Sequence, residues 1–477
     1  MKKLPTHKTK LVCTVGPATD SLEMIEKMIK AGMSVARLNF SHGTFESHGE
    51  TIKKIRVAAQ TTEQRVAIMA DLPGPKMRIG TITNEPIFLK QDAEFILTAD
   101  ECDGDVHKVS MSMKTLPKAV SPGDTLFLSD GLIQLSVKEV QGADIHCRVI
   151  MGGELRSRKG LNIPGIDLGT SAFTKRDLEC LTFALEQGVD AISQSFVDTA
   201  QDILDVRHAA KDLGYDPFII AKIERSSVRD NLDEILEVTD GIMVARGDLG
   251  VEIPIEEIAV VQKFITARAN FYGKPVITAT QMLESMTRNR RPTRAEATDV
   301  ANAILDGTDA VMLSEESAMG NYPIEAISML GKIARATEPK RKGRHFITTL
   351  KPQVHDYQAT KVDVICVSIE KIVAARSNTI AAVLAPTNSG YTANNLSRFR
   401  IPVWILGVST KDKTCQELMF SYGVCPILET DHPDNWTNLA KQYAKDYQLQ
   451  GVTMLQTEGP SPQHQANNHK MEIISLE

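Results

Sequence analysis

Eight short apolar segments, spaced by segments of helical period, are the feature of this sequence that most constrains its fold. Strands are expected near the N-terminus at residues 10–16, 34–40 and 66–71, and further along at 191–196, 218–224, 241–248, 275–281 and 310–316. Amphipathic helices are expected between them, and Thr293 is placed to cap the helix at 293–305. Strands that alternate with helices in this way form parallel β/α units. Eight units in the roughly 250 residues typical of the fold predict a (β/α)8 TIM barrel, with a doubly wound sheet as the alternative.

The alternation breaks between residues 73 and 165, where strand-like segments and turns follow one another without a convincing long helix. This pattern predicts a small all-β domain inserted after the third strand. A basic stretch with one proline and one glycine at 338–343 is typical of a linker, and α/β segments resume beyond it. The predicted domains are the barrel at 1–72 and 166–340, the insertion at 73–165 and a C-terminal α/β domain at 341–477.

Composition and charge exclude several classes of function. The 477-residue chain has a net charge of −6, which gives no sign of a basic surface for nucleic acid. No apolar run approaches the roughly 20 residues needed to cross a membrane, and residues 1–10 have no apolar segment behind them like that of a signal peptide. The seven cysteines are scattered without CxxC spacing, so we expect free thiols in a reducing cytoplasm rather than a zinc site.

The candidate chemistry lies where the predicted strands end, because barrel enzymes carry their active sites on that rim. Lys222 and Glu224 are two apart on one strand, so their side chains point the same way. Glu224 and Asp248, on adjacent strands, could share one Mg²⁺ (or Mn²⁺) through carboxylate oxygens. A structural Lys–Glu ion pair is the alternative, and it is disfavoured because Arg37 and Arg78 lie on the same rim.

Basic residues beside a metal site indicate an anionic substrate. Arg37, Arg78 and Lys222 could bind phosphate oxygens. Residues 245–248, followed by Gly250, are expected to form a tight turn whose backbone amides suit a carboxylate or a phosphate. A glycine pair alone is more often only a turn.

With these residues in hand, the chain resembles the pyruvate kinases over nearly all of its length. Five long motifs carry the resemblance: RLNFSHG at 37–43, AKIE at 221–224, MVARGDLG at 243–250, ATQMLESM at 279–286 and DGTDAVMLS at 306–314. The resemblance implies transfer of the phosphoryl group of phosphoenolpyruvate to ADP, giving pyruvate and ATP in the last step of glycolysis. It also implies that the insertion is a mobile lid and that the enzyme is a cytoplasmic homotetramer.

The resemblance assigns roles to the rim residues by motif position. Glu224 and Asp248 would bind Mg²⁺, Lys222 would stabilise the phosphoryl group in flight, and Arg37 would bind phosphate. Thr280 would serve a water relay that protonates the enolate carbon. The substrate would be held by Thr280 and by the backbone of Ala245, Arg246, Gly247 and Asp248.

The nucleotide region is also assigned by resemblance. Asn39, Ser41, His42, Arg78 and Lys159 would line it, and a second Mg²⁺ would arrive with the nucleotide. Taken alone, Asn39 or Ser41 is usually a turn residue, and His42 more often begins a helix.

Two positions depart from many members of the family. Potassium-dependent pyruvate kinases carry glutamate where this chain has Lys76 and commonly threonine where it has Leu72. The chain therefore resembles the potassium-independent branch, in which the ammonium group of Lys76 could supply the charge that potassium supplies elsewhere. The alternative is a surface lysine at the hinge of the lid. Glu315 also departs, because it stands where the family usually has glycine.

The C-terminal domain is the most divergent part. Residues Thr387, Asn388, Ser389, Gly390 and Thr392 resemble the family's effector-phosphate loop, although Tyr391 replaces a common arginine. The loop could bind a phosphorylated allosteric effector, with Arg398 or Arg400 assisting. Two other functions stay open: a metal-dependent barrel lyase acting on pyruvate or phosphoenolpyruvate, and a non-catalytic metabolite sensor.

Overall fold

The computed structural model describes residues 4–166, 171–341, 359–430, 433, 435–459 and 469–477. Eight parallel strands close into the predicted barrel, in the order β1-β16-β15-β14-β13-β12-β3-β2. The strands are β1 Lys10–Thr14, β2 Val35–Asn39, β3 Ala67–Asp71, β12 Ala191–Gln194, β13 Phe218–Ile223, β14 Gly241–Ala245, β15 Val276–Ala279 and β16 Ala310–Leu313. Almost every residue in them is buried, because the strands face the barrel interior on one side and helices on the other.

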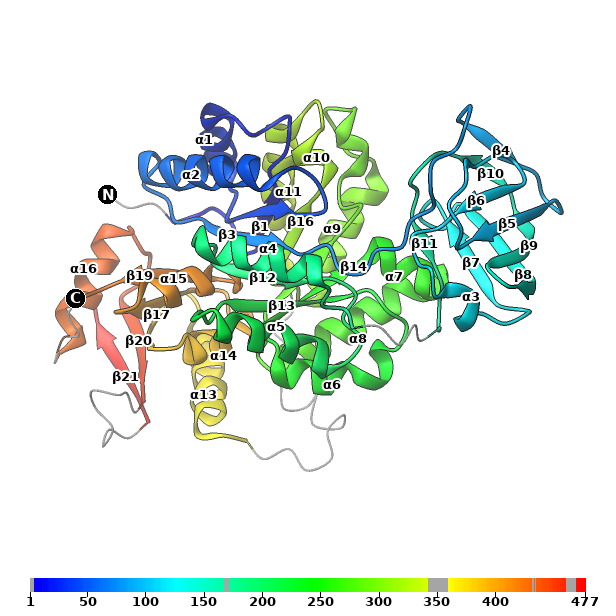
Figure 1. The fold of residues 1–477 in the computed structure, drawn as a ribbon. Coiled ribbons are helices and arrows are strands. Elements are labelled where there is room, and N and C mark those ends of the chain that lie inside the picture. The colour runs from blue at the N-terminus through cyan, green and yellow to red at the C-terminus, as the bar shows by residue number, and fades with distance from the viewer. Residues whose placement is uncertain (1–3, 167–170, 342–358, 431–432, 434, 460–468) are drawn as a thin grey trace.

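Helices surround the barrel (Figure 1). The longer ones are α1 Leu22–Ala31, α2 Phe45–Thr61, α4 Lys175–Glu186, α5 Ala200–Asp212, α6 Val228–Val238, α8 Ile258–Phe271, α9 Arg294–Asp306 and α11 Pro323–Thr337. The predicted cap of α9 is confirmed, since Thr293 Oγ1 accepts the backbone N–H of Glu296 at 3.2 Å.

Most of the barrel strands end one to three residues earlier than expected, and two of them give way to helices within the predicted strand. The strand predicted at 241–248 stops at Ala245, and the tight turn expected at 245–248 is instead the start of helix α7 Arg246–Glu252. The strand predicted at 310–316 stops at Leu313, and α10 Glu315–Ala318 follows. Carboxylates in the first turn of both helices favour this ending, because they face the positive end of the helix dipole.

The insertion is all-β apart from one short helix, as predicted. A six-stranded sheet has the order β11-β7-β8-β9-β5-β6, and β10 pairs with β4. The elements are β4 Ile87–Leu89, β5 Glu94–Thr98, β6 Lys108–Ser110, α3 Leu116–Ala119, β7 Thr125–Leu128, β8 Ile133–Gln141, β9 Asp144–Met151, β10 Gly153–Leu155 and β11 Leu161–Asn162. The insertion has its own apolar core and projects from one end of the barrel (Figure 1).

The C-terminal part is the predicted α/β unit, at the opposite end of the barrel (Figure 1). Its sheet has the order β19-β18-β17-β20-β21, and only β21 is antiparallel to its neighbour. The elements are α13 Lys361–Arg376, β17 Ile380–Pro386, α14 Tyr391–Ser397, β18 Trp404–Ser409, α15 Asp412–Glu417, β19 Val424–Leu428, α16 Trp436–Asp446, β20 Thr453–Glu458 and β21 Lys470–Ser475. In the linker predicted at 338–343, Glu338–Lys340 is a short 3-10 helix, and residues 342 and 343 lie outside the described residues.

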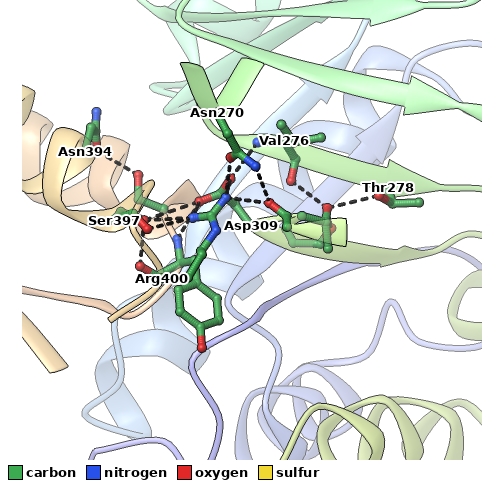
Figure 2. A network of polar contacts seen from close by, with 12 residues as sticks. Asn270, Val276, Thr278, Asp309, Asn394, Ser397 and Arg400 are labelled. Atoms are coloured by element: carbon green, nitrogen blue, oxygen red, sulfur yellow. Dashed lines mark hydrogen bonds and ion pairs between the residues drawn. The ribbon is translucent and has the colours of Figure 1, made fainter. Parts of the chain in front are cut away.

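The C-terminal unit closes the floor of the barrel through buried contacts. Phe420 stacks on Phe218, with ring centroids 5.1 Å apart. Both Nη atoms of Arg400 bind Asp309, at 2.5 Å each, and one of them also binds Asn270 Oδ1 at 2.7 Å (Figure 2). Asp309 precedes β16, so this network ties the floor of the barrel to the segment after α14. Within the described ranges, no helix is both long and apolar enough to span a membrane.

Candidate active site

Lys222 lies at the centre of the rim where the barrel strands end. Its Nζ donates to Ser195 Oγ at 2.6 Å and lies 3.0 Å from Glu224 Oε1 and 3.4 Å from Asp71 Oδ1. Only 12% of the side chain is exposed. Burial alone would lower the pKa of Lys222, but the charges of Asp71 and Glu224 outweigh it and raise the pKa above its ordinary value. The ammonium group is therefore a fixed, permanent positive charge at this rim.

Arg37 reaches the same cluster from β2. Its Nε donates to Asp71 Oδ2 at 2.9 Å, its Nη2 lies 2.5 Å from the same oxygen, and its Nη1 donates to Thr14 Oγ1 at 2.9 Å. A guanidinium has five N–H donors, so two remain for an anion. Burial would raise the pKa of Asp71, but Lys222 and Arg37 hold it below its ordinary value.

Glu224 and Asp248 form the predicted carboxylate pair. Glu224 follows β13 and accepts the backbone N–H of Phe196 at 2.7 Å, whereas Asp248 lies in the first turn of α7. Burial, and also the neighbouring charge of Asp248, raise the pKa of Glu224. Two carboxylates that repel one another on a buried rim suit a divalent cation. No group of three or more potential metal-ligating side chains occurs among the described residues. The pair thus fits Mg²⁺, which usually takes one or two protein carboxylates and completes its shell with water and substrate oxygens.

Thr280 occupies a strained position directly after β15. Its φ is +74° and that of Gln281 is +54°, which is unusual for a β-branched residue followed by another non-glycine residue. Arg246 holds this turn, because its Nη2 donates to the Thr280 carbonyl at 2.6 Å and its Nη1 to Asp299 at 2.6 Å. A Cβ on Gly247 would lie 2.9 Å from Thr280 Cγ2, so only glycine fits there. Strain of this kind concentrates at functional sites.

A positive region adjoins the carboxylate pair under the insertion. Partial burial lowers the pKa of His42, and the charges of Arg78, Arg37 and Lys76 lower it further, so three cations act on this side chain. Lys76 Nζ also lies 3.6 Å from Asp248 Oδ1. The phosphates of the nucleotide were expected in this region from the sequence, and that assignment stays a prediction.

The other predicted nucleotide residues lie at the edges of this region. Asn39 Oδ1 accepts the backbone N–H of Ser41 at 3.1 Å, so Asn39 forms a local turn as well as flanking the rim. Lys159 is exposed on the insertion, and its carbonyl accepts the N–H of Ile79 at 3.0 Å. The hinge between insertion and barrel therefore carries Lys159 and Lys76 on paired segments.

The sequence prediction missed Asp71, Ser193 and Ser195. Ser193 Oγ donates to Asp71 Oδ1 at 3.0 Å, and Ser195 Oγ donates to the Leu72 carbonyl at 2.7 Å while it accepts from Lys222. A signal was present, because Asp71 ends an apolar strand and the two serines are spaced to face one side of the next.

The effector loop prediction needs one correction. Residues 387–390 connect β17 to α14, and Tyr391 is exposed. Arg398 and Arg400, which were expected to assist a phosphate there, are buried in ion pairs with Asp363 and Asp309. Arg400 holds the C-terminal unit against the barrel through Asp309, and so does Arg398, whose Nη1 donates to the Phe271 carbonyl at 2.9 Å. Glu315 is exposed at the start of α10, whereas its neighbour Glu316 is buried.

Comparisons with known proteins agree with this geometry. Residues 6–327 match the family model "Pyruvate kinase, barrel domain", and residues 365–469 match "Pyruvate kinase, alpha/beta domain". The pyruvate kinase of Thermococcus litoralis is 49% identical over 425 residues, which cover 89% of each chain. That of Bacillus licheniformis is 43% identical, over 92% of this chain and 75% of the relative. That of Geobacillus stearothermophilus is 44% identical, over 88% and 71%.

Proposed function

Because this chain belongs to the pyruvate kinase family and converts phosphoenolpyruvate and ADP to pyruvate and ATP, we propose which part of that reaction each residue of its rim carries out. The two alternative functions, a barrel lyase and a non-catalytic metabolite sensor, are therefore rejected. The observation that supports the proposal most strongly is the buried ammonium group of Lys222 between Asp71 and Glu224.

Lys222 and the two carboxylates of the metal pair would carry the phosphoryl transfer. Glu224 and Asp248 would hold Mg²⁺, which the family typically uses and which would supply positive charge for the substrate's carboxylate and phosphoryl oxygens. Lys222 would stabilise the charge that spreads over the phosphoryl oxygens in flight, and Asp71 and Ser195 position its ammonium group beforehand. Arg37 would bind the phosphoryl oxygens with its two remaining N–H donors.

The remaining rim residues would orient substrate and nucleotide. Backbone amides of residues 245–248 at the start of α7 would hold the substrate carboxylate, and Thr280 would relay a proton to the enolate carbon. Arg78, His42, Asn39 and Lys159 would bind the nucleotide as residues 73–165 close over the rim as a lid. A cytoplasmic location is supported by seven cysteines that are thiols rather than disulfides.

We propose that activity does not require potassium. Lys76 Nζ lies 3.6 Å from Asp248 Oδ1, so a covalently attached cation already stands at the metal pair. We expect equal rates in tetramethylammonium chloride and in potassium chloride. The variant Lys76→Glu should lose activity in the organic cation and regain it with potassium, whereas Lys90→Glu on the exposed surface of the insertion should behave like the wild type. A wild-type rate near zero that potassium restores would refute this proposal.

A homotetramer is proposed from exposed apolar side chains at two places on the chain. Ile255, in the 3-10 helix before α8, is 68% exposed, Val260 in the first turn of α8 is 66% exposed, and Ile473 on the edge strand β21 is 62% exposed. Association of identical copies would cover both places, which explains their exposure in a single chain. Sedimentation equilibrium should give the mass of a tetramer for the wild type and of a smaller species for Val260→Glu. A monomeric wild type would contradict the proposal.

The loop at Thr387, Asn388, Ser389, Gly390 and Thr392 is proposed to bind a phosphorylated effector. Residues 387–390 lie between β17 and α14 and Thr392 lies in the first turn of α14, where hydroxyls and backbone amides suit phosphate oxygens.

A further inference from the structure

Helix α7 connects the metal pair to the insertion. It carries Asp248 in its first turn, and Asp248 Oδ1 lies 3.6 Å from Nζ of Lys76, which is on the segment by which the chain enters the insertion. A Cβ on Gly131, in a turn of the insertion, would lie 3.5 Å from Val251 Cγ2 of α7. Figure 1 shows α7 at the end of the barrel that faces the insertion. The insertion therefore packs beside the helix that holds one of the two carboxylates.

The last residue of α7, Glu252, holds the segment by which the chain leaves the insertion. Its side chain is buried, and backbone hydrogen bonds from Gly165 and Ser226 and the charge of Arg225 act on its carboxylate. Arg225 reaches the same segment, because its Nη2 donates to the Ile166 carbonyl at 3.3 Å. The backbone of residues 165 and 166 is thus held by one acidic and one basic side chain.

Each of these two side chains is close in sequence to one carboxylate of the metal pair. Arg225 follows Glu224 directly, and Glu252 lies one helical turn beyond Asp248 on α7. A cavity of about 260 Å³ adjoins them, lined also by residues 75–77 and 161–163 from the two connecting segments of the insertion. Open space separates the connecting segments from the barrel at this point, so their position depends on the hydrogen bonds to residues 165 and 166.

The burial of Glu252 has a cost in stability. Burial raises the pKa of Glu252 to about 7, and the charge of Arg225 and the backbone hydrogen bonds offset this only in part, while the charge of Asp198 adds to it. Between the ordinary pKa of a glutamate and that of Glu252, the folded chain binds this proton more tightly than the unfolded chain, so stability falls as the pH rises through that range. A buried carboxylate that costs stability indicates a functional role.

We propose that Glu252 and Arg225 are positioning residues, which hold residues 165 and 166 so that the insertion stays close to the rim where ADP binds. The inference rests on the proposed closure of residues 73–165 over the rim, and it adds the side chains that favour the closed arrangement. If fewer molecules have the insertion in place, the apparent dissociation constant of the nucleotide rises in proportion. The two residues therefore act on the affinity for ADP and not on the chemical step, which is carried by Lys222 and the metal pair.

Steady-state kinetics of the full chain, with ADP and phosphoenolpyruvate varied separately, test this proposal. We expect Glu252→Gln and Arg225→Met each to raise the KM for ADP about tenfold, the value of one charge-assisted hydrogen bond. The KM for phosphoenolpyruvate, the kcat and the half-saturating Mg²⁺ concentration should stay within about twofold of the wild type, because they depend on barrel residues. The double variant should be no weaker than the single ones, and Arg225→Lys, which keeps the charge, should recover most of the affinity.

Asp190→Asn is the matched control. The Asp190 side chain is only 11% exposed, burial raises its pKa as it does for Glu252, and it pairs with Arg56 at 3.0 Å and accepts the backbone N–H of Ile68 at 2.7 Å. Asp190 precedes β12, at the opposite end of the barrel strands from the rim. Its replacement should therefore leave the KM for ADP unchanged.

A further variant, Lys159→Met, separates this proposal from the proposed function, because it removes a predicted nucleotide contact from the insertion itself. If Lys159→Met raises the KM for ADP while Glu252→Gln and Arg225→Met leave it unchanged, the positioning role is overturned and the lid is retained. If all three variants leave it unchanged, the binding of the nucleotide by the insertion is refuted as well. A loss of kcat at unchanged KM, or an equal rise in KM for both substrates, would show a general structural role and would also overturn the proposal.

Discussion

Replacing Lys222 with methionine should lower the rate of pyruvate formation by about a thousandfold or more, the loss seen when a fixed positive charge is removed from a phosphoryl-transfer site. The ammonium group is held by Ser195, Glu224 and Asp71, so it needs no reorganisation when charge develops on the phosphoryl oxygens. Methionine keeps the length and the packing of the side chain but removes that charge. The rate is measured by coupling pyruvate to lactate dehydrogenase at saturating ADP and Mg²⁺.

Stability must be measured beside the rate, because the same change leaves Asp71 and Glu224 buried without their shared cation. Removing one partner from a buried ion pair typically costs about 3–5 kcal/mol. Lys263→Met is a suitable control, since it removes the ion pair with Asp306 elsewhere on the barrel. A folded Lys222→Met enzyme with wild-type activity would refute the role assigned to Lys222.

Loss of either carboxylate of the metal pair should have the second large effect. We expect Glu224→Gln and Asp248→Asn to raise the Mg²⁺ concentration for half-maximal rate on the order of a hundredfold, or about 2.7 kcal/mol. The amide preserves shape but lacks the charge that a hard cation requires. Titration of the rate with Mg²⁺ measures the shift. Glu252→Gln is the control, because Glu252 lies on the same helix as Asp248 but outside the proposed pair. An unchanged Mg²⁺ dependence in both variants would contradict the assignment.

The barrel could be predicted from the sequence because buried strands and amphipathic helices alternate regularly along the chain. Each barrel strand is an apolar run between amphipathic helices, so its position follows from local pattern. The C-terminal ends of β14 and β16 could not be predicted in this way. The pattern of apolar residues does not show where a strand is replaced by a helix that has carboxylates in its first turn. Arg246 is another example, since only the structure shows its side chain holding the Thr280 turn.

The part of the candidate site that could be proposed from the sequence consists of residues that lie close together within one motif. Lys222 and Glu224 lie two residues apart at the end of β13, and their neighbour Asp248 lies in a second long motif. Asp71 was missed because its partners Arg37 and Lys222 are distant in sequence and meet only when the barrel closes. Arg400 illustrates the same limit, since it binds Asp309 across the junction of two units and not the loop beside it in sequence.

The most direct test of the central claim is a titration of Mn²⁺ followed by electron paramagnetic resonance, which measures metal binding without requiring activity. The wild type should bind Mn²⁺ at one site in the absence of nucleotide, and Glu224→Gln and Asp248→Asn should each weaken that binding strongly. Lys222→Met should still bind the metal, because the lysine repels rather than ligates it. Undiminished Mn²⁺ affinity in both carboxylate variants would show that Glu224 and Asp248 do not hold the metal.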